Sequence, residues 1–188
     1  TDLSALPALV REIASKFGHI DVLVNNAGIH LKKPAIDVTD EEYQRVILTN
    51  QTSVFVLTRE TAKLMAAAGG GSVINISSMA SHYGLPGVIA YAASKSAVEG
   101  MTRTLAVELA RYNIRVNCIA PGFIKTDMSS SALDSDPSRK ERVLARTPMA
   151  RLGKPSEVAD AVSFLVSEAA AFITGIVMPV DGGNSIGF

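Results

Sequence analysis

The sequence of 188 residues contains a single cysteine, Cys118, so it can form no disulfide bond within itself. Cys118 lies in the apolar segment IRVNCIA, which predicts a buried thiol in the core. The sequence also has no excess of charge, since Lys plus Arg and Asp plus Glu number 18 each. Because such a balance produces no long-range field, we expect a small-molecule substrate rather than nucleic acid or an anionic membrane.

Long hydrophobic runs are absent as well. No run approaches the roughly 20 apolar residues that a membrane-spanning helix needs, and we find no internal repeat and no low-complexity tract. Hydrophobic residues nevertheless make up 47% of the sequence, which is enough for a sizeable core and excludes disorder as an account of the whole. We therefore expect a soluble, cytoplasmic protein with one domain over residues 1–188.

Two kinds of catalytic site have no signature here. No serine lies in a GxSxG motif, which argues against a Ser/His/Asp hydrolase of the nucleophile-elbow type. His19 and His30 are expected beside strand ends, but no cysteine or carboxylate accompanies them at ligand spacing. We therefore predict no metal site.

Helical and strand patterns alternate along the sequence. Apolar residues recur at helical spacing from Leu3 to Phe17, and Gly18 ends that pattern before the run IDVLVNNAG. Helical patterns over residues 40–68, 88–111 and 155–170 precede the β-branched runs SVINISS, IRVNCIAPG and ITGIVMPVDGG. This alternation predicts a Rossmann-like α/β fold, a doubly wound parallel sheet between two layers of helices. Ligands in such folds bind where the strands end.

The pattern weakens between Thr126 and Arg151. The polar, turn-rich stretch SSSALDSDPS is followed by RKERVLART, which has helical character. A long segment of this kind predicts either a flap over a site or an ordinary surface loop.

Ser78, Tyr91 and Lys95 form the constellation most suited to chemistry. Ser78 follows a predicted strand, and Tyr91 and Lys95 share one face of the next helix because they are four residues apart. A phenol can deliver or remove the proton that reduction of a carbonyl or oxidation of an alcohol requires. A nearby ammonium would lower the tyrosine pKa by about one to three units, and a serine can donate to the reacting oxygen. The YxxxK spacing alone would also suit an aromatic ring packed beside a solvated lysine, but its position after a strand end favours catalysis.

Further motifs extend this pattern over the whole sequence. They are NNAG at residues 25–28, Asn50 in LTNQTSVF, ISS ending at Ser78, YAASK at residues 91–95, RVNCIAPGFIKTDM and GIVMPVDGG. Together and in this order, they resemble the short-chain dehydrogenase/reductase family. The resemblance implies an enzyme that transfers hydride between NAD or NADP and a carbonyl or secondary alcohol of a sugar, polyol, aldonate or 3-oxoacyl substrate. The segment SALDSDPSRKERVLARTPMARLG is also similar to gluconate and related sugar dehydrogenases.

The resemblance also implies roles for individual residues. Tyr91 would be the general acid/base, and Lys95 would lower its pKa and bind the nicotinamide ribose. Ser78 would orient the substrate carbonyl. Asn50 would hold a water that links Lys95 to solvent, although a satisfied buried amide is an alternative.

Other positions would contact the ligands. His82 and Tyr83 are expected to border the substrate, or else simply to lie on the surface. The NNAG segment could also be a plain turn. The further residues implied along the cofactor are Asn25, Ala27, Gly28, Pro121, Gly122, Ile124 and Thr126. Finally, the resemblance implies a homo-oligomer, a tetramer or a dimer, paired through the helices of residues 40–68 and 88–111.

The sequence departs from the family at its start. Family members begin with a strand and a glycine-rich TGxxxGxG turn whose amide groups bind the cofactor pyrophosphate, and these residues contain no such segment. We therefore expect part of a longer protein, with the strand near residue 22 as an uncovered sheet edge. We also expect weak dinucleotide binding by these residues alone, and the residue that selects NAD or NADP to lie in the missing part.

Two other functions stay open at this point. A non-catalytic subunit or remnant could keep the oligomer interface without the nucleotide site. The epimerase/dehydratase branch shares the YxxxK spacing, but its members usually carry a larger carboxy-terminal domain.

Overall fold

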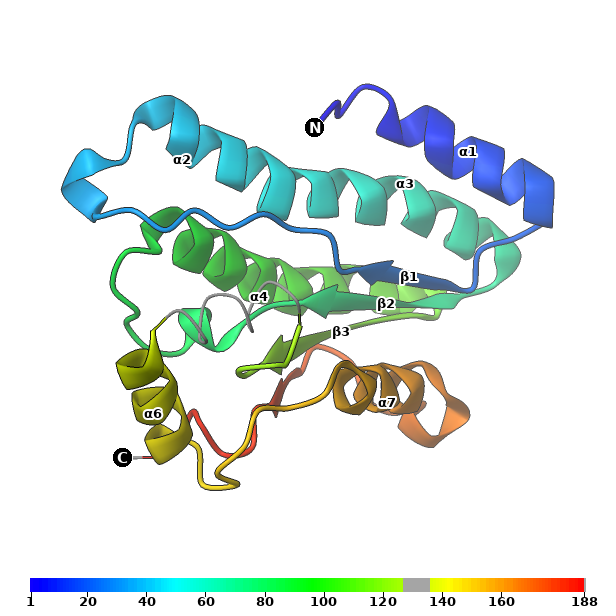
Figure 1. Cartoon of the computed structure of the whole chain (residues 1–188). Helices are drawn as coiled ribbons and strands as arrows, with labels where there is room; N and C mark the ends of the chain where they lie inside the picture. Colours follow the sequence, from blue (N-terminus) through cyan, green and yellow to red (C-terminus); the bar gives the residue numbers. More distant parts are fainter. Residues whose placement is uncertain (127–135, 188) are drawn as a thin grey trace.

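The structure is a computed structural model that describes residues 1–126 and 136–187 (Figure 1). Within these residues, four strands form a sheet in the order β1-β2-β3-β4, and every neighbouring pair is parallel. The strands are β1 (Val22–Asn25), β2 (Gly71–Ile76), β3 (Ile114–Pro121) and β4 (Val177–Val180). This arrangement confirms the predicted parallel α/β sheet.

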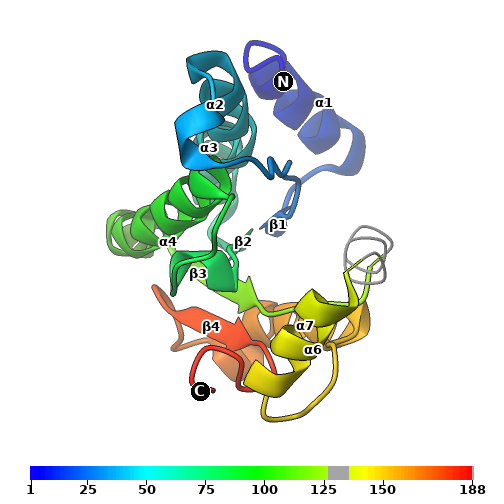
Figure 2. The ribbon, with the colours of Figure 1, turned by 60° about the vertical axis from the view of Figure 1, so that its left-hand side comes forward.

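Helices cover both faces of the sheet. Figure 2 shows α3 (Ser53–Ala68) and α4 (Ile89–Leu109) on one side and α7 (Pro155–Val166) on the other. Helix α1 (Leu6–Phe17) packs on α3, while α2 (Asp40–Ile47) and α6 (Pro137–Arg146) lie toward the ends of the strands (Figure 1). The short helical turns are η1 (Ala35–Asp37), η2 (Leu48–Thr52), η3 (Met79–Ser81), η4 (Ala110–Tyr112) and η5 (Glu168–Ala170). The three-layer architecture is therefore confirmed.

The core lies on both faces of the sheet, as alternating side chains of covered strands require. Val73 and Val116 pack beneath α3 and α4, whereas Ile74 and Ile119 pack with Leu165 of α7. Cys118 is fully buried, and burial raises the pKa of its thiol to about 12. The prediction of a buried core thiol is confirmed.

The structure divides the single helix predicted over residues 40–68. Helix α2 begins at a capping box in which Thr39 Oγ1 accepts from the Glu42 amide and Glu42 Oε2 accepts from the Thr39 amide. It ends at Ile47, where the π-helical turn η2 follows and leads into α3. A π turn inserts an extra residue into a helix and often lies at a functional site. Periodicity alone could not reveal it, because the apolar positions continue on either side.

Strand β1 forms one edge of the sheet, as predicted. Leu23 packs under the helices, whereas Val22 and Val24 point to the opposite face and are 40% and 41% exposed. Helix α7 covers β2, β3 and β4 on that face. The face of β1 turned away from α3 is therefore apolar and open.

Residues 1–126 and 136–187 contain neither a candidate membrane span nor a candidate metal cluster. None of the helices there has the length and hydropathy needed to cross a bilayer. Among the same residues, His, Cys, Asp and Glu side chains form no group of three or more that could hold a metal ion.

Candidate active site

The carboxyl ends of the four parallel strands meet at one edge of the sheet, on the left in Figure 1. The loops that leave Asn25, Ile76, Pro121 and Val180 therefore start close together. Apart from Asn50 in η2, the residues predicted for the site lie at the ends of these strands, in the loops that follow them or at the start of α4. Chain topology thus gathers them at one place.

Ser78, Tyr91 and Lys95 are brought together at this edge. Ser78 lies just beyond β2, where its hydroxyl accepts from the Ala80 amide at 3.2 Å and caps η3. The Ser78 side chain also lies near the phenol of Tyr91, in the first turn of α4, and acts to lower its pKa. The ammonium of Lys95, one turn further, lies 5.6 Å from the centroid of the Tyr91 ring. The geometry places a hydroxyl, a phenol and an ammonium side by side.

Burial is the main cause of the pKa shifts of Tyr91 and Lys95. It raises the pKa of Tyr91, and the Ser78 side chain opposes that effect only in part. This direction is opposite to the one that the sequence predicted. Burial also lowers the pKa of Lys95 to about 8, and the Lys95 Nζ donates to the Ile76 carbonyl at 2.7 Å. In this arrangement Tyr91 is a neutral phenol, the form that can donate a proton.

The side chain of Asn50, in η2, hydrogen-bonds both the segment after β1 and helix α4. Its Oδ1 accepts from the Ile29 amide at 2.7 Å, while Nδ2 donates to the Ile29 carbonyl at 2.8 Å and to Ser94 Oγ at 3.2 Å. Both Nδ2 hydrogens are therefore used, and only Oδ1 retains accepting capacity for a water. The water-relay role stays a prediction, whereas a satisfied buried amide is what the hydrogen bonds show.

The NNAG segment, residues 25–28, passes next to Asn50 and Lys95. The buried side chain of Asn25 donates to Thr58 Oγ1 at 3.0 Å and to Asn75 Oδ1 at 2.9 Å, so it anchors the strand end internally. Ala27 and Gly28 are exposed. A Cβ added to Gly28 would lie 3.3 Å from Asn50 Oδ1 and 3.7 Å from Lys95 Nζ. The missing side chain therefore leaves space next to both functional residues.

The loop after β3 has a clear packing role. The Gly122 amide donates to the Val180 carbonyl at 3.0 Å, and a Cβ at Gly122 would lie 2.7 Å from Asp181 Cα. Further on, Ile124 forms an isolated parallel bridge with Gly153. Pro121 is the last residue of β3, and Thr126 is exposed. Their contact with a cofactor stays a prediction.

His82 and Tyr83 make internal contacts. His82 Nε2 lies 3.0 Å from Glu99 Oε1, and the Tyr83 hydroxyl donates to Asn184 Oδ1 beneath the guanidinium of Arg146. Their predicted contact with substrate stays a prediction. The proposed flap falls in part on residues 127–135, which lie outside the described residues, while the helical RKERVLART corresponds to α6.

Sequence reasoning did not place His30 at the site. Its ring packs against Tyr91, with centroids 5.3 Å apart. Burial and the positive charges of Arg139 and Lys32 lower the His30 pKa. Only the position of His30 directly after NNAGI could have suggested this contact.

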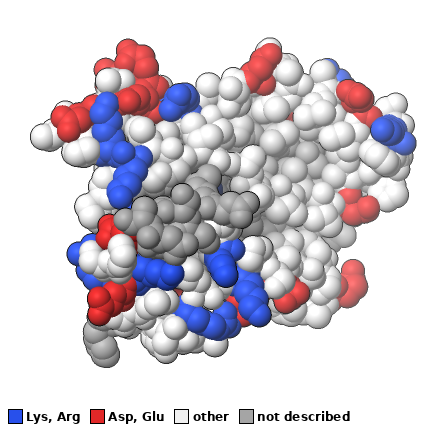
Figure 3. Space-filling view, viewed as in Figure 1, with Lys and Arg blue, Asp and Glu red and all other residues white. Residues whose placement is uncertain are grey.

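Charged side chains of both signs gather near the strand ends. On the left of the face in Figure 3, the side to which the strands point in Figure 1, Lys and Arg side chains lie among Asp and Glu side chains. Lys32 and Arg139 belong to this side, since both act on His30. These two positive charges favour an anionic group next to His30.

Comparisons with known proteins agree with this geometry. The family described as enoyl-(acyl carrier protein) reductase matches residues 1–185. The 3-oxoacyl-[acyl-carrier-protein] reductase FabG of Thermotoga maritima is 43% identical over 183 residues, which cover 97% of this chain and 73% of that protein. The chain belongs to the short-chain dehydrogenase/reductase family.

Solved structures place the chain within the same family of short-chain dehydrogenases/reductases. A gluconate 5-dehydrogenase from Burkholderia cenocepacia J2315, in complex with NADP and tartrate, has a TM-score of 0.95 and 34% identity. All of this chain and 73% of that chain are covered. A 7α-hydroxysteroid dehydrogenase complexed with NADH and 7-oxo glycochenodeoxycholic acid has a TM-score of 0.92 and 38% identity, over 97% of this chain and 70% of that one. Membership confirms the oxidoreductase class that the sequence predicted.

The residues present fit the nicotinamide cofactor that short-chain dehydrogenases/reductases use. The absent side chain at Gly28 leaves backbone open beside Asn50 and Lys95, where a Cβ would intrude. The ammonium of Lys95 has one described acceptor, the Ile76 carbonyl, and three hydrogens to donate. Both features suit a polar ligand that approaches the backbone closely.

Proposed function

We propose that this protein transfers hydride between NAD or NADP and a carbonyl or secondary alcohol of a sugar, polyol, aldonate or 3-oxoacyl substrate. The observation that carries the proposal is the contact of Tyr91 with both Ser78 and Lys95 at the strand ends. The relatives' names support the substrate range, since one is a 3-oxoacyl reductase and another a gluconate 5-dehydrogenase. The positive charges of Lys32 and Arg139 beside His30 favour the anionic members of that range.

In the reductive direction, Tyr91 delivers its proton to the oxygen of the substrate. Burial supports this role, because it raises the pKa of Tyr91 and keeps the phenol protonated. Ser78 donates a hydrogen bond to the same oxygen as negative charge develops there. The bound nicotinamide supplies the hydride, and in the oxidative direction it accepts one.

Lys95 and Asn50 complete the proposed catalytic set. The buried ammonium of Lys95 binds the nicotinamide ribose and favours the phenolate that forms when Tyr91 loses its proton. Asn50 fixes the backbone at Ile29 and hydrogen-bonds a water that links Lys95 to solvent. Asn25, Ala27, Gly28, Pro121, Gly122, Ile124 and Thr126 lie along the cofactor, and His82 and Tyr83 border the substrate.

The assembly is also part of the proposal. The helical segments of residues 40–68 (α2, η2 and α3) and 88–111 (mainly α4) would pair with copies of themselves in a homotetramer or a homodimer. Light scattering coupled to size exclusion measures this directly, and a monomer at micromolar concentration contradicts it.

Tyr91→Phe and Ser78→Ala in the full-length protein test the reaction. A panel of sugars, aldonates and 3-oxo esters is assayed with NADH and NADPH, and cofactor oxidation is followed by absorbance. We expect Tyr91→Phe to lower kcat at least about a hundredfold. The matched control is Tyr112→Phe, which changes an exposed tyrosine in η4 and leaves turnover unchanged. Near-normal turnover of Tyr91→Phe removes Tyr91 from this role.

The same panel discriminates the alternative function. If the wild-type protein oxidises neither cofactor with any member of the panel, a non-catalytic subunit that retains the oligomer interface becomes the better account.

A further inference from the structure

A buried carboxylate lies beneath the loop that carries Ser78. Glu99 follows Lys95 by one turn of α4, and its side chain is only 11% exposed. Its Oε1 accepts from Ser77 Oγ at 2.6 Å and from Ser81 Oγ, and it lies 3.0 Å from His82 Nε2. Among the described residues, its charged partner is His82, and no lysine or arginine forms an ion pair with it. The carboxylate is therefore held almost entirely by residues 77–82.

These contacts bracket Ser78 on both sides. Ser77 precedes it, while Ser81 and His82 follow it across η3. Within the loop, the hydroxyls of Ser77 and Ser81 lie 3.1 Å apart, and the single hydrogen of Ser81 Oγ is shared between Glu99 Oε1 and the Ser78 carbonyl. One carboxylate thus ties together the backbone that enters Ser78 and the backbone that leaves it.

The charge on Glu99 suits this arrangement. An ionised carboxylate only accepts hydrogen bonds, with about four lone-pair positions. Two hydroxyls and an imidazole can all donate to it, which offsets the cost of burying the charge. An amide in its place would present two hydrogens to groups that now donate, so the loop would have to rearrange.

Tyr91, Lys95 and Glu99 are spaced four residues apart along α4 and share one side of the helix. The phenol and the group that secures the Ser78 loop are therefore fixed to the same rigid element. A displacement of about 1 Å at a reacting group can lower a rate about a hundredfold. The contacts of Glu99 link the Ser78 loop to α4, and the distance between the Ser78 hydroxyl and the Tyr91 phenol depends on this link.

We propose that Glu99 is a positioning residue that holds the Ser78 hydroxyl against Tyr91, and that His82 acts through Glu99. This inference rests on the proposed function. It makes Ser78 the one group through which Glu99 affects turnover.

A double-mutant cycle in the full-length protein tests the proposal. Glu99→Gln is measured alone and in a Ser78→Ala background. We expect the single change to lower kcat by about 10- to 100-fold, and to change kcat less than about twofold once Ser78 is alanine. The dissociation constant of the cofactor stays unchanged. Glu108→Gln, an exposed glutamate on the same helix, is the matched control and leaves kcat unchanged.

Equal losses in both backgrounds overturn the proposal, because they would show a general structural role. His82→Phe provides a second variant if Glu99→Gln folds poorly. We expect a lower kcat that again disappears in the Ser78→Ala background, whereas a higher KM at unchanged kcat contradicts action through Glu99.

Hydrogen exchange separates this inference from the proposed reaction. The amides of residues 77–82 should exchange faster in Glu99→Gln than in the wild type, whatever the substrate of the protein. Unchanged protection of that segment refutes the positioning role even if hydride transfer is demonstrated. Faster exchange in a protein without hydride transfer supports it and refutes only the reaction.

Discussion

The imidazole of His30 lies against the phenol ring of Tyr91, with centroids 5.3 Å apart and planes tilted by 54°. Along residues 28–34 exposed and half-buried side chains alternate, as in an extended segment, so Gly28, His30 and Lys32 share one face. Gly28 lies near Lys95, and His30 lies on Tyr91. The segment after β1 therefore runs outward along the proposed catalytic residues and forms one wall of the site.

His30→Ala should remove the ring packing between residue 30 and Tyr91, whereas His30→Phe should preserve it. An aromatic pair contributes about 0.5–1.5 kcal/mol beyond its buried area, so we expect kcat/KM to fall about tenfold for alanine. Burial already lowers the His30 pKa, so a neutral ring is the native state and phenylalanine should stay within about threefold of the wild type. Steady-state kinetics at neutral pH measure both variants. Equal losses for the two would show that the imidazole nitrogens matter instead.

Gly28→Ala should reduce cofactor affinity more than stability. The new Cβ would lie 3.3 Å from Asn50 Oδ1 and 3.7 Å from Lys95 Nζ, in space that we assign to the cofactor. We expect a dissociation constant for NAD(P)H raised at least about tenfold, or about 1.4 kcal/mol, measured by titration calorimetry. Gly100→Ala is the control, because nothing lies within 4 Å of a Cβ there and a helical alanine stabilises by about 0.5–1 kcal/mol. Unchanged affinity in Gly28→Ala would remove Gly28 from the cofactor site.

Asn50→Ala should destabilise the fold itself. The change removes three hydrogen bonds and leaves the amide and carbonyl of Ile29 without their partner. Since an unsatisfied buried group costs about 1–3 kcal/mol, we expect the free energy of unfolding to fall by about 2–3 kcal/mol in urea titrations. Gln44→Ala, at an exposed position of α2, should change it by less than about 0.5 kcal/mol. A similar small loss at Asn50 would mean that water replaces the amide without penalty.

Much of the site could be predicted because its information is local. The spacing of Tyr91 and Lys95 on a helix, and the place of Ser78 after a strand, follow from short sequence patterns. The alternation of helices and strands then brings the strand ends to one edge. The local apolar pattern also identified Cys118 as a core thiol, whereas the edge position of β1 followed from the family resemblance.

What escaped prediction depends on contacts between distant segments. His30 reaches Tyr91, and Glu99 reaches Ser77, only after the sheet has formed. The π turn around Asn50 interrupts a helix whose apolar pattern continues unbroken. Equal totals of positive and negative residues gave no sign of the charged side chains that gather on one side in Figure 3, because composition does not record where charges lie.

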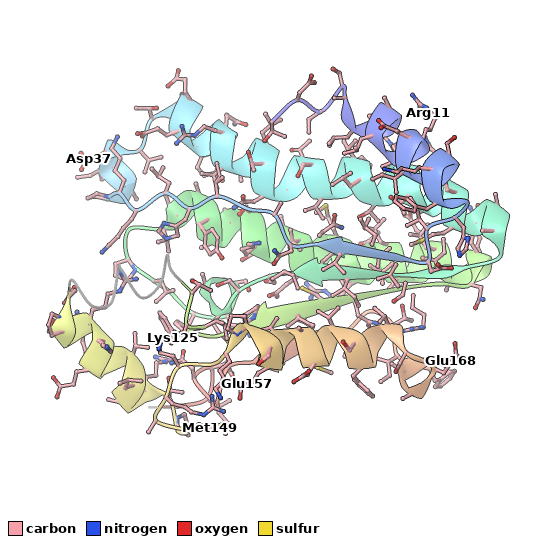
Figure 4. The ribbon with its side chains drawn as sticks, turned by 45° about the vertical axis from the view of Figure 1, so that its right-hand side comes forward. Arg11, Asp37, Lys125, Met149, Glu157 and Glu168 are labelled. Atoms are coloured by element: carbon pink, nitrogen blue, oxygen red, sulfur yellow. The ribbon has the colours of Figure 1, made fainter. Side chains whose placement is uncertain are left out.

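The start of α7 allows a pH test independent of catalysis. Glu157 lies at this helix end, at the same end of the sheet as Lys125 (Figure 4). Its carboxylate accepts from Arg151 at 2.6 and 2.9 Å and from the Lys154 amide at 2.7 Å. The Arg151 hydrogen bond, the Lys154 amide and their charges lower the Glu157 pKa from 4.5 to about 2.

Because the folded pKa lies below the unfolded value, the unfolded chain binds more protons between pH 4.5 and 2. The stabilisation is therefore complete above pH 4.5 and is lost as the pH falls toward 2. In Glu157→Gln this contribution is absent at every pH, so the variant should be less stable than the wild type at pH 6 and approach it near pH 2.5. Urea titrations at several pH values measure the difference. A gap that stays constant down to acid pH would show that the carboxylate is not ionised at the helix end.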